Sequence, residues 1–257
     1  MHRFFVERGA IGATFIEITA KEDVGHITRV LRLRPGERIL VADGEGWEYL
    51  CVLEEVTKQS VTARIEDKQK NATETVYRVT LYQGIPKGSK LDVTVQKCIE
   101  LGVSRIAPVF MKRSVTSDKG NYGKKTDRLR AIAEAAAKQC GRGMIPPVED
   151  AITFTEMMED LAHYPLVVFP YENENGETLK DALLAARSKG ILPAEGEPQE
   201  PVDIALVIGP EGGFADEEAE ALKQMPTCCC VSLGRRILRT ETAGMAALAM
   251  LLYELEL

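Results

Sequence analysis

Residues 203–214 read DIALVIGPEGGF, an apolar run that ends in a glycine-rich segment. Continuous apolar residues are typical of a parallel strand that is covered on both faces. Because α/β folds bind ligands at the carboxyl ends of such strands, where glycine lets the backbone approach a ligand, this stretch predicts an α/β domain with a site at 209–214. The segment matches neither the dinucleotide fingerprint nor the phosphate-binding loop. A tight turn without a ligand is the alternative.

The same pattern continues through the chain from residue 75 onward. Strands are expected at 75–84, 104–110, 164–169, 203–209 and 228–233, and helices at 89–101, 126–140 and 241–256. Apolar strands that alternate with helices indicate a parallel sheet with helices on both faces. A segment rich in Pro, Gly and Glu at 190–202 predicts an exposed loop.

The first 70 residues have a different texture, with short β-branched runs separated by turn residues. The runs lie at 14–18, 38–42, 48–53 and 60–65. Apolar residues at helical spacing predict one helix at 22–33, and polar residues 66–75 predict a linker. We therefore expect a smaller β-rich domain at 1–72 and an α/β domain at 73–257.

The composition, 45% hydrophobic and 28% charged over 257 residues, excludes a disordered or fibrous chain. No run approaches the roughly 18 to 20 apolar residues of a membrane helix, and the N-terminus lacks a signal peptide's apolar stretch. We expect a cytoplasmic protein with no membrane partner. The net charge of −7 conceals a basic block, since residues 78–142 carry 14 basic and 5 acidic groups. Such a block is typical of a surface that binds a polyanion, with a solvated basic face as the alternative.

Six cysteines occur without CxxC spacing, and three of them are consecutive at 228–230. On a strand these three would point to alternate sides, so they could not easily share one metal ion. We expect reduced thiols and no metal.

A second candidate site lies at 232–243, SLGRRILRTETA, between the last strand and the last helix. Thr240 can cap that helix, and Glu241 is favoured in its first turn by the helix dipole. A capped helix with a solvated basic loop is the alternative. The helix itself is apolar on most of its circumference, so it is buried in the core or against a second subunit, which predicts a homodimer.

Together these segments resemble the RsmE family of ribosomal RNA methyltransferases within the SPOUT superfamily. The motifs are RFFV (3–6), HITRVLRLRPGE (26–37), QKCIELGVSRIAPVF (96–110), KRSV (112–115), EAAAKQCGR (134–142), IPPV (145–148), GPEGGF (209–214) and SLGRRILRTETA (232–243). They occur in the family's order and span nearly the whole chain, and the last two in tandem are the most specific. Residues 86–92 and 190–202 depart from the family pattern.

The resemblance implies an α/β fold, with a knotted (trefoil) SPOUT methyltransferase domain and a smaller N-terminal PUA-like β-barrel that helps to bind RNA. It also implies that S-adenosyl-L-methionine binds in the knot loops at a homodimer interface. The implied reaction is methylation of N3 of a uridine in small-subunit (16S) ribosomal RNA, either as free RNA or in the assembled small ribosomal subunit.

The resemblance and the chemistry together predict three groups of site residues. An arginine can stabilise the uridine anion that forms when N3 loses its proton, and a carboxylate can accept that proton or orient its neighbours. The expected catalytic residues are Arg239, Arg236 and Glu241. The expected cofactor-binding residues are Phe169, Pro170, Ile208, Gly209, Pro210, Glu211, Gly212, Gly213, Leu233, Gly234, Ile237, Leu238, Thr242 and Ala243. The expected RNA-binding residues are Arg29, Arg32, Lys97, Lys112, Arg113, Gln139 and Arg142.

Two other functions stay open. One is another SPOUT RNA methyltransferase that modifies a ribose 2′-hydroxyl, against which the first domain and EAAAKQCGR favour the uridine N3 group. The other is a noncatalytic RNA-binding factor in ribosome assembly, against which the intact GPEGG and RTETA segments argue. His26 either extends the RNA track or packs as a polar residue beside the barrel.

Overall fold

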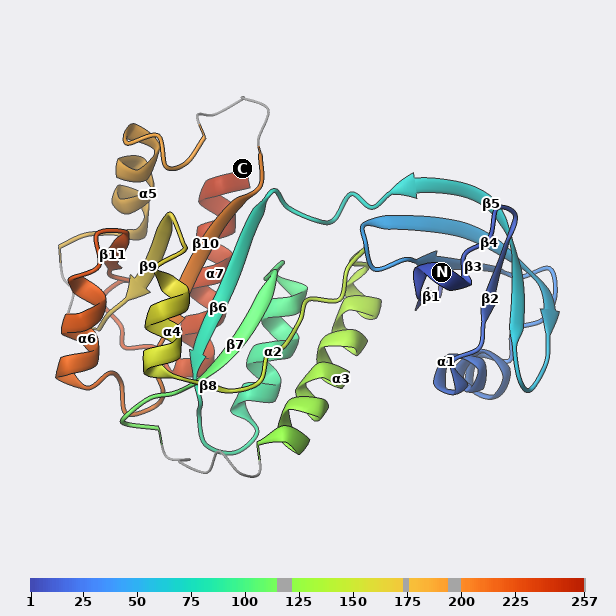
Figure 1. The fold of residues 1–257 in the computed structure, drawn as a ribbon, viewed down its shortest axis with the longest axis horizontal. Helices are drawn as coiled ribbons and strands as arrows, with labels where there is room; N and C mark the ends of the chain where they lie inside the picture. The colour runs from blue at the N-terminus through green and yellow to red at the C-terminus, as the bar shows by residue number, and fades with distance from the viewer. Residues whose placement is uncertain (115–121, 173–175, 194–199, 257) are drawn as a thin grey trace. The chain divides into compact units, whose positions relative to one another are not determined.

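The computed structural model describes residues 1–114, 122–172, 176–193 and 200–256 (Figure 1). The chain forms two compact units. The first comprises Met1–Glu74 and Ala137–Ile145, and the second comprises Thr75–Ala136 and Pro146–Leu257.

The first unit is built on a five-stranded sheet with the order β1-β3-β4-β5-β2. Its strands are β1 (Arg3–Phe5), β2 (Phe15–Ile18), β3 (Arg38–Ala42), β4 (Trp47–Val56) and β5 (Val61–Lys70). Strands β1 and β3 pair in parallel, and the other neighbours pair antiparallel. The sheet curls into a half-barrel, as Figure 1 shows.

Short helical segments accompany this sheet. They are the 3₁₀ helix η1 (Arg8–Ala10), α1 (Lys21–Gly25) and the π-helix η2 (His26–Leu31). Val24 and Ile27 join the core of the unit, which explains the apolar spacing in this part of the sequence. The helix expected at 22–33 therefore forms, and it ends at Arg32, whose φ of 55° stops it.

The segment Ala137–Ile145 belongs to the first unit because charged groups hold it there. Arg142 is buried, and its guanidinium donates to both carboxylate oxygens of Glu74 at 3.2 and 2.6 Å. Arg3 donates to the Arg142 carbonyl and to Glu48. Although burial alone would raise the pKa of Glu48, hydrogen bonds from Gln69, Asn71 and Arg3 hold it below its ordinary value.

The second unit has a six-stranded sheet with the order β11-β9-β10-β6-β7-β8, and every pair is parallel. Its strands are β6 (Tyr77–Gly84), β7 (Arg105–Phe110), β8 (Ile152–Thr153), β9 (Leu166–Pro170), β10 (Val202–Ile208) and β11 (Cys228–Val231). Its helices are α2 (Lys90–Glu100), α3 (Gly123–Cys140), α4 (Phe154–Leu161), α5 (Leu179–Ser188), α6 (Asp216–Lys223) and α7 (Thr240–Glu256). The last turn of α3, from Ala137, is assigned to the first unit.

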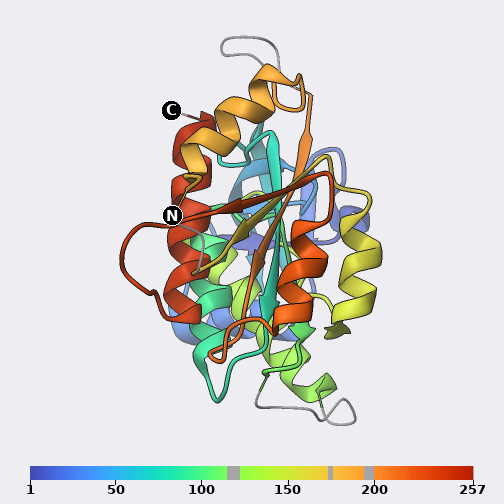
Figure 2. The same cartoon turned by 90° about the vertical axis from the view of Figure 1, so that its left-hand side faces the viewer.

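Helices cover both faces of this sheet, as Figures 1 and 2 show. Apolar residues of α4 and α6, such as Met157 and Leu222, pack with Tyr82, Val167 and Val207 in one core cluster. Helices α2 and α7 lie together on the opposite face. Strands β7 and β8 lie on one side of β6, whereas β9, β10 and β11 lie on the other, so the sheet has a switch point between β6 and β10.

The strands and helices expected after residue 75 are confirmed, with ends that differ by a few residues. The linker expected at 66–75 is wrong over 66–70, because these polar residues continue β5, whose side chains there face solvent. The pattern did not locate β1, β8, α4, α5 or α6. The loop expected at 190–202 includes residues 194–199, which lie outside the described residues. Within the described ranges, no helix combines the length and the hydropathy that a membrane crossing requires.

Candidate functional site

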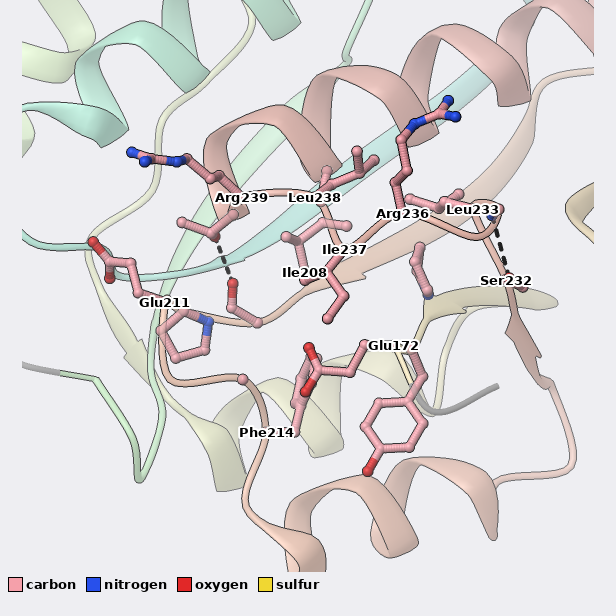
Figure 3. Close-up of a pocket in the computed structure, with 18 of the residues that line it drawn as sticks. Glu172, Ile208, Glu211, Phe214, Ser232, Leu233, Arg236, Ile237, Leu238 and Arg239 are labelled. Carbon is pink, nitrogen blue, oxygen red and sulfur yellow. Dashed lines mark hydrogen bonds between the residues drawn. The ribbon is translucent and has the colours of Figure 1, made fainter. Parts of the chain in front are cut away.

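Three loops at the carboxyl ends of β9, β10 and β11 surround a pocket of about 450 Å³ (Figure 3). The first loop contributes Pro170, Tyr171 and Glu172, and the second contributes Gly209, Pro210, Glu211, Gly213 and Phe214. The third loop, between β11 and α7, supplies most of the remaining wall. Adjacent parallel strands place their following loops at one edge of the sheet, so this is the ligand-binding position that the fold predicts.

Two glycines allow the second loop to form. A Cβ atom on Gly209 would lie 2.8 Å from the Phe214 ring, closer than real Cβ contacts permit. Gly213 has φ of +67°, and a Cβ atom there would lie 3.1 Å from Oε1 of Glu172. The end of β6 also lies close to the second loop, since a Cβ atom on Gly84 would lie 2.5 Å from the Pro210 nitrogen. The glycines of this motif therefore serve close packing as well as backbone exposure.

A buried hydrogen-bond chain connects the second and third loops. The hydroxyl of Thr240, the first residue of α7, donates to the Gly209 carbonyl at 2.6 Å. The side-chain amide of Gln83, at the end of β6, donates to the Thr240 oxygen at 2.8 Å. Gly244 leaves room for this amide, because a Cβ atom there would lie 3.1 Å from Gln83 Oε1. The chain fixes the start of α7 to the strand that carries the glycine loop.

Aromatic rings support the pocket from β9. Phe169 packs edge-to-face on Phe214 with ring centroids 4.8 Å apart, and it stacks on Tyr171 at 5.3 Å. Phe169 is fully buried and belongs to the core rather than to the pocket lining. The aromatic cluster therefore holds the first and second loops together.

Glu211, one of the acidic residues that line the pocket, forms an ion pair with Lys90. It accepts hydrogen bonds from the Lys90 ammonium at 2.9 Å and from the Lys87 amide at 3.0 Å. Partial burial alone would raise the pKa of Glu211, but these bonds, with the Lys90 charge, hold it below its ordinary value. Glu211 therefore stays ionised and ties the glycine loop to the start of α2.

The third loop carries three exposed arginines, Arg235, Arg236 and Arg239, and all three line the pocket. None of them forms an ion pair with a residue in the described ranges. Figure 3 shows that the guanidinium groups of Arg236 and Arg239 point outward from the cavity in different directions, with Arg239 on the side of Glu211. These cations are therefore positioned at the rim of the pocket.

Glu241 differs from the two expected catalytic arginines because it is not part of the pocket lining. Its Oε2 atom is buried and has no hydrogen-bond partner among the described residues. The Lys90 ammonium lies 4.0 Å from that atom. Lys90 thus lies near two carboxylates, Glu211 of the glycine loop and Glu241 of the first turn of α7.

Most of the expected cofactor-binding residues meet at this one pocket. They are Pro170, Ile208, Gly209, Pro210, Glu211, Gly213, Leu233, Gly234, Ile237, Leu238 and Ala243. Three others do not line it, namely Phe169, Gly212 and Thr242. A Cβ atom on Gly212 would instead lie 3.0 Å from Cβ of Arg113, so this glycine serves a packing contact between two turns.

Three lining residues lie outside the segments that the sequence predicted, namely Lys90, Tyr171 and Glu172. Four more, Phe214, Ser232, Arg235 and Thr240, lie within the candidate segments 209–214 and 232–243 but were not among the expected site residues. Tyr171 and Glu172 directly follow the strand expected at 164–169, and Phe214 ends the glycine motif, so the rule for strand ends could have included them. Lys90 reaches the site only through the tertiary contact with Glu211.

The expected RNA-binding residues fall into two groups. Four of them form ion pairs, namely Lys97 with Glu100, Lys112 with Glu217, Arg113 with Asp216, and Arg142 with Glu74. The other three, Arg29, Arg32 and Gln139, are exposed in the first unit and have no ion pair in the described part of the chain. His26 is exposed, and its ring lies edge-on to Phe4.

The cysteines at 228–230 form β11, as expected. Burial raises the pKa of Cys228 to about 12, which keeps this thiol protonated at neutral pH. The described residues contain no group of three or more His, Cys, Asp or Glu side chains that could hold a metal ion.

Comparison with known proteins gives consistent results for both units. The RNA methyltransferase domain family matches residues 73–252, and the RNA methyltransferase PUA domain family matches residues 18–66. The Ribosomal RNA small subunit methyltransferase E of Bacillus subtilis is 33% identical over 100% of this chain and 98% of its own length. The Synechocystis protein of the same name is 32% identical over 94% of this chain and 73% of its own length.

Solved structures agree with these relatives. The Neisseria gonorrhoeae Ribosomal RNA small subunit methyltransferase E, bound to S-adenosyl methionine, superposes with a TM-score of 0.80. It is 29% identical and covers 98% of this chain and 97% of its own. A Legionella pneumophila structure with bound SAM gives a TM-score of 0.78 at 30% identity, over 98% of this chain and 96% of its own.

These matches and the strand pairing confirm the expected fold class, an α/β SPOUT domain with a smaller PUA-like β-domain. The trefoil knot stays a prediction. Because both family matches and the full-length relatives point the same way, the chain belongs to the family of the Ribosomal RNA small subunit methyltransferase E proteins.

Proposed function

We propose that this protein is an S-adenosyl-L-methionine-dependent methyltransferase that modifies N3 of a uridine in small-subunit ribosomal RNA. The observation that carries the proposal is the pocket in which the GPEGG loop and the LGRRILRT loop meet at the ends of adjacent parallel strands. The names of the full-length relatives support the same chemistry.

The pocket suits a ligand of this kind in size and lining. Its volume of about 450 Å³ lies within the range of small-molecule sites, roughly 300–1,000 Å³. Ile208, Leu233 and Leu238 offer apolar surface for an adenine ring, and Gly209, Pro210 and Gly213 of the glycine loop also line the cavity. When bound, S-adenosyl-L-methionine supplies an electrophilic methyl group on its sulfonium sulfur.

The chain's own residues have two tasks in the proposed reaction. The uridine N3 must lose its proton, and it must be held in line with the methyl group. Arg239 and Arg236, at the rim of the pocket, stabilise the anion that deprotonation leaves on the base. Glu241, whose Oε2 atom lacks a hydrogen-bond donor in the described structure, is the proposed proton acceptor or orienting group.

The target uridine must present its pairing edge, so the proposal requires a single-stranded or flipped-out nucleotide. Arg29, Arg32 and Gln139 are the proposed RNA contacts of the first unit, because all three are exposed and neither arginine forms an ion pair with a described residue. Lys97, Lys112 and Arg113 can contribute to RNA binding by exchanging their carboxylate partners for phosphates. Arg142 is buried against Glu74, which favours a structural role for it.

We also propose that the protein acts as a cytoplasmic homodimer. Met250 and Tyr253 on α7, with Leu184 on α5, are large apolar side chains that the single chain leaves exposed. Burying them against a second copy would remove apolar surface from water. Sedimentation at micromolar concentration should show a dimer, and a monomer would contradict this part of the proposal.

Two measurements test the enzymatic proposal. Calorimetry should show that the purified protein binds S-adenosyl-L-methionine, and labelled cofactor should transfer its methyl group to small ribosomal subunits rather than to large ones. Cofactor binding without transfer to any ribosomal RNA would favour the noncatalytic assembly factor. Transfer to a ribose would favour the 2′-hydroxyl methyltransferase.

A further inference from the structure

Glu172 is an exposed residue that brings a carboxylate to the wall of the pocket. This residue follows β9 and lines the cavity. Figure 3 shows its carboxylate beside the Phe214 ring and below Ile237, directed into the cavity. The missing side chain of Gly213 leaves space for it, since a Cβ atom there would lie 3.1 Å from Glu172 Oε1.

The charges around Glu172 leave it without a partner. Only Glu172 and Glu211 bring carboxylates to the described lining, and Glu211 is paired with Lys90. No cation in the described ranges lies within ion-pair distance of Glu172. The guanidinium groups of Arg236 and Arg239 point away from it, as Figure 3 shows. The Glu172 carboxylate is therefore available to pair with a cationic group of a bound ligand.

The chemistry of a carboxylate decides which part of a ligand it prefers. An ionised carboxylate is an acceptor only, so its best partner is a cation that also carries N–H donors. S-adenosyl-L-methionine has two cationic groups, a sulfonium with no hydrogen-bond donor and an α-ammonium with three. The ammonium satisfies the charge and the hydrogen-bonding capacity of Glu172 together.

We propose that Glu172 binds the α-ammonium group of the cofactor and thereby fixes the direction in which its amino-acid end enters the pocket. This inference rests on the proposed cofactor and assigns a residue to one of its groups. The same contact would serve S-adenosylhomocysteine, which keeps the ammonium and lacks the sulfonium charge. It would not serve 5′-methylthioadenosine, which lacks the amino-acid end.

The test compares these three ligands in calorimetric titrations of the wild type and of Glu172→Gln, which keeps the shape of the side chain and removes its charge. The variant should bind S-adenosyl-L-methionine and S-adenosylhomocysteine about 5- to 10-fold more weakly, because a charge-assisted hydrogen bond is lost. It should bind 5′-methylthioadenosine within about 2-fold of the wild type. Glu159→Gln, at an exposed position on α4, is the matched control and should change none of the three affinities.

Three results would overturn the inference. Equal weakening of all three ligands would assign Glu172 to the nucleoside or to the shape of the pocket. Weakening of S-adenosyl-L-methionine alone would assign it to the sulfonium. Unchanged or tighter binding of the two amino-acid-bearing ligands would show that the ammonium lies elsewhere. If the wild type itself bound no S-adenosyl-L-methionine, the proposed function would fail as well, so the two failures can be told apart.

Discussion

The Thr240 hydroxyl donates a hydrogen bond to the Gly209 carbonyl at 2.6 Å, so the first residue of α7 is fastened to the end of β10. The same oxygen accepts from the Gln83 amide, which brings β6 into the contact. Three segments that are far apart in the sequence therefore meet at the hydroxyl of Thr240, a buried residue in the wall of the pocket. The sequence predicted Thr240 as a cap that precedes the last helix. In the structure Thr240 is instead the first residue of α7, and its hydroxyl connects the glycine loop to Gln83 of β6.

Replacement of Thr240 by Val tests this connection, because valine has nearly the same shape without the hydroxyl. The Gln83 amide and the Gly209 carbonyl would each lose a partner in a buried site, at a cost of about 1–3 kcal/mol. We expect a lower Tm and weaker cofactor binding in the same variant. Thr155→Val, at an exposed position on α4, should change neither measurement.

Replacement of Gly213 by Ala separates backbone strain from pocket geometry. An alanine at φ of +67° costs roughly 1–2 kcal/mol, and its Cβ atom would also press on Glu172. Gly190 is the matched control, since its φ is +70° and no atom lies within 4 Å of a Cβ placed there. Denaturant unfolding should show similar losses for both variants, whereas calorimetry should show weaker cofactor binding only for Gly213→Ala. Equal affinities in the two variants would contradict the role given to Gly213.

Removal of the Arg239 side chain should abolish activity with little loss of stability. Arg239 is exposed and has no ion-pair partner in the described ranges, so its deletion should shift Tm by only about 2 °C or less. Loss of a group that stabilises a developing anion typically lowers kcat by about 100-fold or more. Arg78→Ala, at an exposed position on β6, is the control. Near-normal kcat in Arg239→Ala would remove this residue from the mechanism.

The Lys90–Glu211 pair makes a prediction about pH. The pKa of Glu211 in the folded protein lies below its ordinary value near 4.5, so the pair stabilises the fold above that pH and loses its effect as the pH falls through the folded-state pKa. Lys90→Met should therefore be less stable than the wild type at pH 7. The difference should shrink in urea titrations below about pH 4. A difference that stays constant with pH would contradict an electrostatic role.

The first unit offers a stability test at Arg142. Its guanidinium is buried and makes two hydrogen bonds with the Glu74 carboxylate, so Arg142→Met would leave that charge without its partner. We expect a loss of about 3 kcal/mol in the free energy of unfolding. The double variant Arg142→Met with Glu74→Gln should recover part of it. Full stability in the single variant would return Arg142 to the set of RNA-contact candidates.

Local pattern was sufficient for the parallel sheet, because continuous apolar runs such as 204–208, bounded by turn residues and alternating with helices, are typical of strands covered on both faces. It was insufficient for α6, whose first turn carries Asp216, Glu217 and Glu218 and whose apolar face is short. It also failed at 66–70, where polar residues extend β5 and residues 67–70 pair with 47–50 of β4. In that strand, backbone pairing outweighs the preference of polar residues for loops.

The sequence predicted the part of the pocket that the motifs at 209–214 and 232–243 form. Lys90 and Glu172 were missed because each enters the pocket from a separate element, at the start of α2 and after β9. Lys97, Lys112 and Arg113 were identified by charge alone, and their carboxylate partners lie in contacts that a count of charges does not reveal. A count of basic residues along the sequence therefore gives more unpaired positive charge than the folded protein has.

The most direct test of the account is the identity of the methylated nucleoside. The protein should be incubated with labelled S-adenosyl-L-methionine and small ribosomal subunits that lack their modifications, and the RNA should then be digested and separated by chromatography. The account predicts label in 3-methyluridine, with none when Arg239→Ala replaces the wild type. Label in any other nucleoside would contradict the assignment to uridine N3, and absence of label from a protein that binds the cofactor would contradict methyl transfer itself.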